Sequence, residues 1–235
     1  MDLFYIEPAL AGNDHIQLSE ETSRHVVAVM RMRSGDRLQL ADGNGNLLTA
    51  EINEAHKKHC TVNVLDRQFF QRNTRELILA VSLLKNTSRF EWMLEKVTEI
   101  GITRIVPLFC ARTEKQQFRF DRMKNILESA MMQSNQYWLP GLDHPTPVSA
   151  FIDGIEATTK ILVAHCMEGD KVPLHQALSD PADSTLIMIG PEGDFTTEEV
   201  QQVKQHGGRA VSLGDTRLRT ETACIVAAAL LKNVF

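Results

Sequence analysis

The sequence of 235 residues predicts an α/β fold with a mostly parallel sheet, preceded by a small β-barrel. Short apolar runs alternate with amphipathic helical patterns in the second part of the chain, as a parallel sheet requires. Two glycine-bearing loops near the C-terminus each join such a run to a helix. The first part instead carries closely spaced strands and hairpin turns. We therefore expect two domains, residues 1–72 and residues 73–235.

The N-terminal domain is predicted from strands separated by turn residues. Residues 38–41, 47–52 and 60–65 are short, mainly apolar runs. Residues 42–46 contain an Asp-Gly and an Asn-Gly pair, the strongest local signal for a hairpin. Several short strands with such turns indicate a small β-barrel.

The next domain begins with an alternation of strands and helices. Residues 77–84 predict a strand, and Ser88 with Glu91 predicts a capped helix that ends at Gly101. Residues 104–109 predict the following strand. The pattern continues with a helix at residues 121–133 and a strand at residues 161–164.

Two strand–loop–helix units follow each other at the C-terminus. In the first, residues 185–189 form the strand, Thr196 and Glu199 form a capping box, and Gly207-Gly208 ends the helix. In the second, residues 210–213 form the strand, and Thr220 is the expected N-cap of a helix at residues 221–232. Because parallel strands end at the same sheet edge, the two loops are expected at one ligand site.

The residues of these loops suit a ligand site, although glycine pairs often serve only to turn a chain. Glycines let a ligand approach the backbone, and Glu192, Arg217 and Arg219 add charge beside apolar segments. Two simpler interpretations stay open. Glu221 is also favourable as a negative charge at a helix N-terminus, and Arg219 is also suited to holding the loop through an ion pair.

Both loops resemble the cofactor loops of a known enzyme family. Ile189-Gly190-Pro191-Glu192-Gly193 and Leu213-Gly214, followed by Leu218-Arg219-Thr220-Glu221-Thr222-Ala223, resemble the signatures of the RsmE-type ribosomal RNA uridine N3-methyltransferases of the SPOUT superfamily. The resemblance extends to an upstream set of residues, namely Lys85, Arg89-Phe90-Glu91-Trp92, Lys96, Thr98, Glu99, Gly101, Gln133-Ser134 and Pro140. Arg24-His25, Met30-Arg31, Gly35-Asp36 and Asp42-Gly43 are similar to the RNA-binding domain of the family.

This resemblance implies both a fold and an activity. The expected fold is a PUA-like β-barrel followed by a SPOUT domain with a C-terminal trefoil knot, although general topology rules would argue against a knot. The expected activity is S-adenosylmethionine-dependent methylation of uridine N3 in 16S ribosomal RNA of the small subunit. Family members are typically homodimers, and Met131, Met132, Tyr137, Trp138 and residues 223–231 offer apolar surface or ordinary core.

The resemblance also implies the site residues. The cofactor-binding set is Ile189, Gly190, Pro191, Glu192, Gly193, Leu213, Gly214, Leu218, Arg219, Thr220, Thr222 and Ala223. Uridine N3 carries a proton, so Glu221 or Glu192 is a candidate to accept it. Arg219 is a candidate to stabilise negative charge on the base.

RNA contacts are expected from Arg24, His25, Arg31, Arg33, Lys85 and Arg89. A solvated face also explains such clusters. The chain departs from related sequences at Asp2-Leu3, where arginines are common, and at Asn135-Gln136, where glycine-arginine is common. Lys115, Arg119 or the basic cluster between residues 24 and 37 would have to compensate for this lost charge.

Composition limits the other possibilities. A net charge of −5 argues against broad nonspecific nucleic-acid binding. The four cysteines are far apart and lack metal-site spacing, so neither a metal nor a disulfide framework is expected. No apolar run has the length of a membrane span and no signal sequence is evident, so the cytoplasm is the expected location. The alternatives are a noncatalytic RNA-binding ribosome assembly factor on the same fold and an unrelated nucleotide-dependent α/β enzyme.

Overall fold

The computed structural model describes residues 1–114, 117–180 and 182–233. Lys115, a candidate compensating cation, lies outside the described residues. The contacts divide the chain into two compact units. Unit 1 comprises Met1–Arg72 and Glu128–Leu139, and unit 2 comprises Asn73–Leu127 and Pro140–Phe235.

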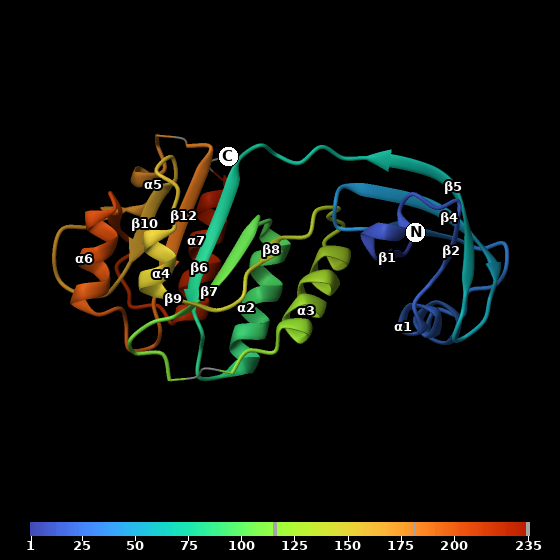
Figure 1. Ribbon diagram of the computed structural model, residues 1–235, viewed down its shortest axis with the longest axis horizontal. Coiled ribbons are helices and arrows are strands. Elements are labelled where there is room, and N and C mark those ends of the chain that lie inside the picture. Colours follow the sequence, from blue (N-terminus) through green and yellow to red (C-terminus); the bar gives the residue numbers. More distant parts are fainter. Residues whose placement is uncertain (115–116, 181, 234–235) are drawn as a thin grey trace. The chain divides into compact units, whose positions relative to one another are not determined.

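Unit 1 is built on a curled sheet of five strands in the order β1-β3-β4-β5-β2 (Figure 1). β1 pairs with β3 in parallel and the other pairs are antiparallel. The bounds are β1 Leu3–Tyr5, β2 His15–Gln17, β3 Arg37–Ala41, β4 Asn46–Glu54 and β5 Thr61–Phe69, with short helices η1 Pro8–Leu10, α1 Glu20–Arg24 and η2 His25–Val29. The predicted hairpin is confirmed as β3 and β4. The carboxylate of buried Asp42 stabilises its turn by accepting the backbone N–H groups of Asn44 and Asn46.

The segment Glu128–Leu139 joins unit 1 through the tip of this hairpin. Gly45 has a φ of +89°, and its N–H donates to the carbonyl of Tyr137 at 2.8 Å. Trp138 Nε1 donates to the carbonyl of Phe70, also at 2.8 Å. A Cβ atom on Gly45 would lie 2.7 Å from the Trp138 ring, so only glycine permits this contact.

Unit 2 contains the predicted parallel sheet, in the order β11-β13-β10-β12-β6-β7-β8, with β9 also paired to β7. All of these pairs are parallel. The bounds are β6 Glu76–Ser82, β7 Arg104–Phe109, β8 Gly141–Leu142, β9 Thr146–Pro147, β10 Lys160–Ala164, β11 Val172–Pro173, β12 Ser184–Ile189 and β13 Arg209–Ser212. The central strands read as continuous apolar runs because both of their faces are buried.

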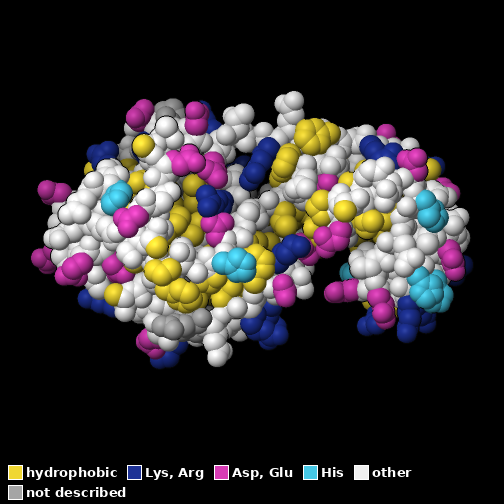
Figure 2. Space-filling model, in the orientation of Figure 1, with side chains coloured by type: hydrophobic (Ala, Val, Ile, Leu, Met, Phe, Trp, Pro, Cys, Tyr) yellow, Lys and Arg dark blue, Asp and Glu magenta, His cyan; other side chains and the backbone are white. Residues whose placement is uncertain are grey.

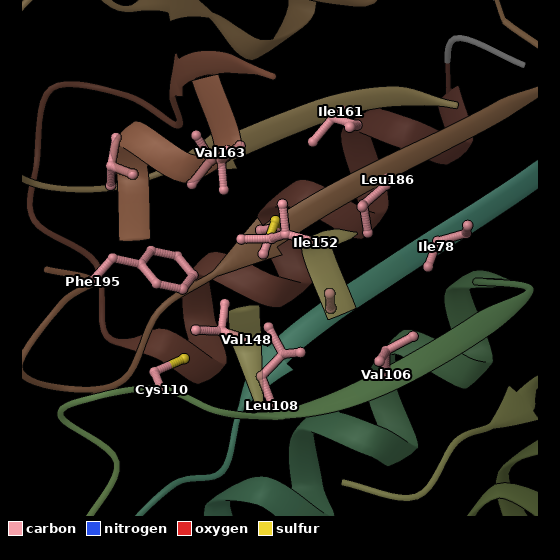
Figure 3. Packing of buried hydrophobic residues seen from close by; sticks show 14 of the residues in the cluster. Ile78, Val106, Leu108, Cys110, Val148, Ile152, Ile161, Val163, Leu186 and Phe195 are labelled. Carbon is pink, nitrogen blue, oxygen red and sulfur yellow. The ribbon is translucent and has the colours of Figure 1, made fainter. Parts of the chain in front are cut away.

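Helices cover both faces of this sheet (Figure 1). On one face, α2 Thr87–Ile100 packs against α7 Thr220–Asn233, and α7 also contacts α5 Leu174–Ala177. On the other face, α4 Val148–Asp153 and α6 Thr197–Gln205 close over a core that includes Ile152, Leu186 and Phe195 (Figure 3). The remaining helix, α3 Phe120–Gln133, begins in unit 2 and ends in unit 1.

The C-terminal strand takes an unusual place in the sheet. β13 lies between β10 and β11, which are consecutive along the chain and earlier than β13. After β13 the chain continues into α7, which contacts β6 and β12 on the far side of β10. A late strand therefore lies between two earlier ones. The trefoil knot itself stays a prediction.

Two helix starts differ from the sequence prediction. Ser88 is not the cap of α2; the side chain of Asn86 accepts the N–H groups of Ser88 and Arg89, and Glu91 pairs with Arg122. Asparagine is as good a cap as serine, and it comes two residues earlier. The predicted capping box of Thr196 and Glu199 is confirmed in α6.

Thr220 is not the N-cap of α7 but its first helical residue. The carbonyl of Arg219 accepts the N–H of Ala223 at 2.8 Å, so Arg219 occupies the capping position. The Thr220 hydroxyl instead donates to the carbonyl of Gly190 at 3.1 Å. This buried bond ties the second glycine loop to the first.

Candidate active site

A cavity of about 580 Å³ lies in unit 2 where β10, β12 and β13 end. Its wall combines three segments that follow these strands. The lining residues are Arg89, Ala164, His165, Cys166, Lys171, Ile189, Gly190, Pro191, Glu192, Asp194, Val211, Ser212, Leu213, Gly214, Asp215, Thr216, Arg217, Leu218, Arg219, Thr220, Glu221 and Ala223. The two glycine loops therefore meet at one cavity, which is the position that parallel α/β sheets use for ligands.

The first loop makes contacts within itself and with two other segments. A Cβ atom on Gly190 would lie 3.0 Å from both the backbone nitrogen and the ring of Phe195, so the close approach here is to Phe195. Asp194 has a φ of 66°, and its carboxylate accepts the N–H of Cys166 at 2.7 Å. Glu192 is exposed, and its carboxylate accepts the N–H of Lys85 at 3.2 Å.

Gly193 is the one residue of the first loop signature that does not line the cavity among the described residues. Its carbonyl accepts a hydrogen bond of 2.7 Å from Arg112 Nη1. A Cβ atom on Gly193 would lie 3.3 Å from the Arg112 side chain. Arg112 thus occupies the space on this side of the loop.

The second loop borders the cavity with open space around its glycine. Gly214 has a φ of +136°, and no heavy atom lies within 4 Å of an added Cβ atom. Leu213 and Leu218 are half-buried, whereas Arg217 and Arg219 are exposed. The loop therefore offers both apolar contact and positive charge to a ligand.

Glu221 combines burial with a charged partner. It is 7% exposed, and its carboxylate lies 3.6 Å from Arg89 Nη1. It also stands in the first turn of α7, where the helix dipole stabilises a negative charge. Glu221 is therefore a carboxyl group shielded from bulk water, with an arginine as its charged partner.

A flanking cavity of about 610 Å³ adjoins the first. Arg89, Arg217, Leu218, Arg219 and Glu221 line both cavities. The flanking cavity is completed by residues of α2 and α7, namely Ser88, Trp92 and Thr222. Thr222, which we predicted to bind the cofactor, thus lies on the wall of the flanking cavity.

His165 is a cavity residue that sequence reasoning missed. Both of its ring nitrogens are buried and have no hydrogen-bond partner. Burial, and then the charge of Lys171, lowers the pKa of this histidine, so the neutral imidazole is favoured. The only feature of the sequence that could have indicated His165 is its position directly after the predicted strand at residues 161–164. The place of that strand between β12 and β13 depends on sheet order, which periodicity does not give.

The predicted RNA-binding residues divide between the two units. Arg24, His25, Arg31 and Arg33 lie in unit 1 and are exposed. Lys85 lies in unit 2, where an ion pair of 2.7 Å with Glu114 raises its pKa. On the face shown in Figure 2, basic and acidic side chains of the described residues are interspersed, without a broad basic surface.

The described residues contain no candidate metal site. In the described part of the chain, no three or more histidine, cysteine, aspartate or glutamate side chains are placed to hold a metal ion together. All four cysteines are free, and burial raises the pKa of Cys110 to about 12. None of the described helices has the length and hydrophobicity to cross a membrane.

Comparisons with known proteins identify the family. The family model described as an RNA methyltransferase domain matches residues 71–232, and the RNA methyltransferase PUA domain matches residues 18–65. Ribosomal RNA small subunit methyltransferase E of Rickettsia conorii is 26% identical over 231 residues, which cover 97% of this chain and 93% of the relative.

Solved structures agree over the whole chain. A probable rRNA-methyltransferase from Porphyromonas gingivalis is 33% identical, with a TM-score of 0.91 and coverage of 100% of this chain and 98% of that one. Ribosomal RNA small subunit methyltransferase E from Neisseria gonorrhoeae, bound to S-adenosyl methionine, is 26% identical, with a TM-score of 0.89 and the same coverage, 100% and 98%. The chain therefore belongs to the RNA methyltransferase family, with the RsmE-type ribosomal RNA small subunit methyltransferases as its relatives.

Proposed function

We propose that this protein uses S-adenosylmethionine to methylate N3 of a uridine in 16S ribosomal RNA of the small subunit. The observation that carries the proposal is the meeting of both glycine loops at one cavity, beside a buried carboxylate and several arginines. The Neisseria gonorrhoeae relative, which binds S-adenosyl methionine, supports the choice of cofactor.

The cavity fits this cofactor in size and in chemistry. Its volume of about 580 Å³ is in the usual range for small-molecule sites. Ile189, Leu213 and Leu218 offer apolar walls for an adenine ring, and the first turn of α7 leaves backbone N–H groups without helical partners. Carboxylates of Glu192, Asp194 and Asp215 also line the cavity, and negative charge favours a sulfonium cation. We assign cofactor contacts to the predicted loop residues that line it.

The chain's own residues supply positioning and proton transfer. When bound, the cofactor supplies a methyl group that already carries its leaving group, so alignment of the base is the main task of the protein. Glu221 accepts the N3 proton in this proposal, because it is a buried carboxylate on the wall shared by both cavities. Arg219 balances the charge that develops on the base carbonyls. Glu192 stays a second candidate base, although its carboxylate also bonds to Lys85.

We extend the proposal to the organisation of the protein. Residues 1–72 form the PUA-like RNA-binding domain and residues 73–235 the SPOUT methyltransferase domain. Arg24, His25, Arg31 and Arg33 contact RNA from the first domain, and Lys85 and Arg89 from the second. The protein acts as a homodimer on small subunits in the cytoplasm.

The decisive experiment is methyl transfer to purified small subunits. Subunits from a strain that lacks this gene are incubated with the protein and S-adenosylmethionine, and 16S RNA nucleosides are then analysed by mass spectrometry. We expect one new N3-methyluridine. Binding of the subunit without methyl transfer would instead favour the noncatalytic assembly factor.

A further inference from the structure

Trp92 is an exposed aromatic residue on α2. Its side chain is 46% exposed, whereas Phe90, Met93 and Leu94 beside it on α2 are buried. A single exposed apolar residue is ordinary, so the case for a binding role depends on the groups around Trp92. The α2 positions of Ser88 and Arg89 are four and three residues before Trp92, so these side chains share its helix face.

This face opens into the flanking cavity. Trp92 lines that cavity together with Arg89, Arg219 and Glu221, which also line the proposed cofactor cavity. Because these residues line both cavities, a group bound against Trp92 would lie next to the proposed cofactor cavity. Among the described residues, Trp92 is the only phenylalanine, tyrosine or tryptophan that lines either of these two cavities.

The chemistry of uridine explains why an aromatic platform is needed here. N3 lies on the Watson–Crick edge of the base, so it is accessible only when the base is unpaired and withdrawn from its stack. Enzymes that modify such a base replace the lost stacking with aromatic or apolar side chains and read its exposed edge with polar groups. We propose that the target uridine stacks on Trp92 in the flanking cavity, with its Watson–Crick edge toward Glu221 and Arg219. This inference rests on the proposed function.

The charges around Trp92 suit a nucleotide more than an isolated base. Arg217 and Arg219 are exposed, and Arg89 is partly exposed beside its ion pair with Glu221. Arginines bind phosphate oxygens well and stay charged at any working pH. Ser88 and Thr222 add hydroxyl groups on the same wall. The pocket therefore offers stacking, phosphate neutralisation and one carboxylate, which is the set that a flipped uridine nucleotide requires.

The kinetic test compares Trp92→Ala and Trp92→Phe with the wild type. Loss of base stacking of the usual strength lowers kcat/KM for small subunits about tenfold or more. Trp92→Phe keeps an aromatic face and restores much of this loss. Affinity for S-adenosylmethionine, measured by calorimetry, stays unchanged in both variants, because Trp92 does not line the cofactor cavity.

A fluorescence test observes stacking directly. The chain has two tryptophans, so Trp138→Phe leaves Trp92 as the only one, and Trp92→Phe is the matched control. Titration of Trp138→Phe with single-stranded oligouridylate, with S-adenosylhomocysteine present, is expected to quench the emission of Trp92. The control retains Trp138, which does not line either cavity of the site, and it is expected to show little quenching.

Three outcomes separate the possibilities. Wild-type kcat/KM in Trp92→Ala together with no quenching would overturn the stacking role while leaving the methyltransferase proposal intact. Conversion of a dimer into a monomer by Trp92→Ala, seen by light scattering, would assign Trp92 to a subunit interface and also overturn it. Absence of methyl transfer by the wild type would refute the proposed function. Quenching of Trp92 by oligouridylate would in that case still test whether a base stacks on Trp92.

Discussion

Glu221 is the residue on which the proposed chemistry depends most. It is a buried carboxyl group at the start of α7, and it lines both cavities of the site. Replacement by glutamine keeps the shape and removes the base, so we expect Glu221→Gln to lower kcat by about 10²- to 10⁴-fold. Methyl transfer to small subunits measures the change, and calorimetry checks that the cofactor still binds.

The matched control for this variant is Glu198→Gln. Glu198 also stands in the first turn of a helix, α6, but is exposed and does not line either cavity of the site. It is expected to retain wild-type turnover. Equal turnover in Glu221→Gln would remove Glu221 as the base and direct attention to Glu192.

His165 links the cavity to the pH dependence of stability. Its pKa is lowered in the fold, so the folded state binds fewer protons than the unfolded state when the pH lies between the two values. Lys171 and Lys204 disfavour its protonation, whereas Asp194 favours it. The stabilising contribution is therefore present above the unfolded pKa and is lost as the pH falls. We expect His165→Gln to lose less stability than the wild type on acidification from about pH 7 to pH 5.

Urea unfolding at several pH values measures this difference. Comparison of the two proteins removes the contribution of the other histidines, which they share. Parallel loss of stability in both proteins would show that His165 does not experience different surroundings in the two states. His175, which is exposed on α5, provides the control substitution His175→Gln.

The residues that sequence reasoning found and missed differ in a simple way. Glycine, proline and charge in an ordered motif marked both loops, and most of their residues do line one cavity. His165, Cys166 and Lys171 carry no motif, and they reach the cavity only because β10 lies next to β12 and β13. Trp92 belonged to a matched motif, but its exposure depends on which face of α2 is covered.

Among the structural elements, the two cofactor loops use their glycines for different reasons. At Gly190 an added methyl group presses on Phe195, a fully buried residue, so Gly190→Ala is expected to cost about 1–3 kcal/mol of unfolding free energy. At Gly214 the space is open but φ is +136°, so Gly214→Ala strains an exposed loop and lowers cofactor affinity more than global stability. Thermal unfolding and calorimetry on both variants distinguish these effects. Identical profiles for the two variants would contradict the assignment.

The capping box of α6 gives a prediction about element stability. The Thr196 hydroxyl accepts the N–H of Glu199 at 3.2 Å, and the Glu199 carboxylate accepts the N–H groups of Thr196 and Ala111. Thr196→Ala removes one of these bonds and is expected to cost about 1 kcal/mol, or a few degrees in Tm. Thr196→Ser, which keeps the hydroxyl, should restore it. A Tm equal to the wild type in Thr196→Ala would show that Glu199 alone holds the turn.

Strands and helices followed from the sequence more closely than their ends did. Apolar runs located the central strands, and helical periodicity located α2, α6 and α7 on the sheet. The short helices α4 and α5 were not predicted. The starts of α2 and α7 were misplaced because several residues near each start are suitable caps, and tertiary contacts choose between them. The hydroxyl of Thr220, for example, bonds to Gly190 and not to its own helix.

At the scale of the whole molecule, the division of the chain predicts how fragments behave. Glu128–Leu139 belongs to unit 1, although it lies within the sequence of the second domain. A fragment of residues 73–235 would retain this segment without the hairpin tip at Gly45, so Tyr137 and Trp138 would lose their partners. We expect the fragment to associate and to unfold at a lower temperature than the full chain, as measured by light scattering and calorimetry. A monomeric fragment with native stability would contradict this expectation.

Turn-rich strands followed by alternating strands and helices predict two domains, residues 1–72 and residues 73–235. These local patterns do not predict that Glu128–Leu139 belongs to unit 1. The hairpin tip pairs with a segment more than ninety residues later through Gly45 and Tyr137, through Gly43 and Leu139, and through a β-bridge of Asn44 with Trp138. No periodic signal in the sequence marks a contact of this kind.

The position of β13 has a consequence for folding during synthesis of the protein. A ribosome releases a chain from its N-terminus onward, so β10 and β11 leave the exit tunnel before the strand that separates them. The sheet must keep a gap at its edge until Arg209–Ser212 arrives and α7 follows. A nascent chain stalled before Arg209 therefore lacks one whole wall of its cavity, and catalytic competence is a post-translational event.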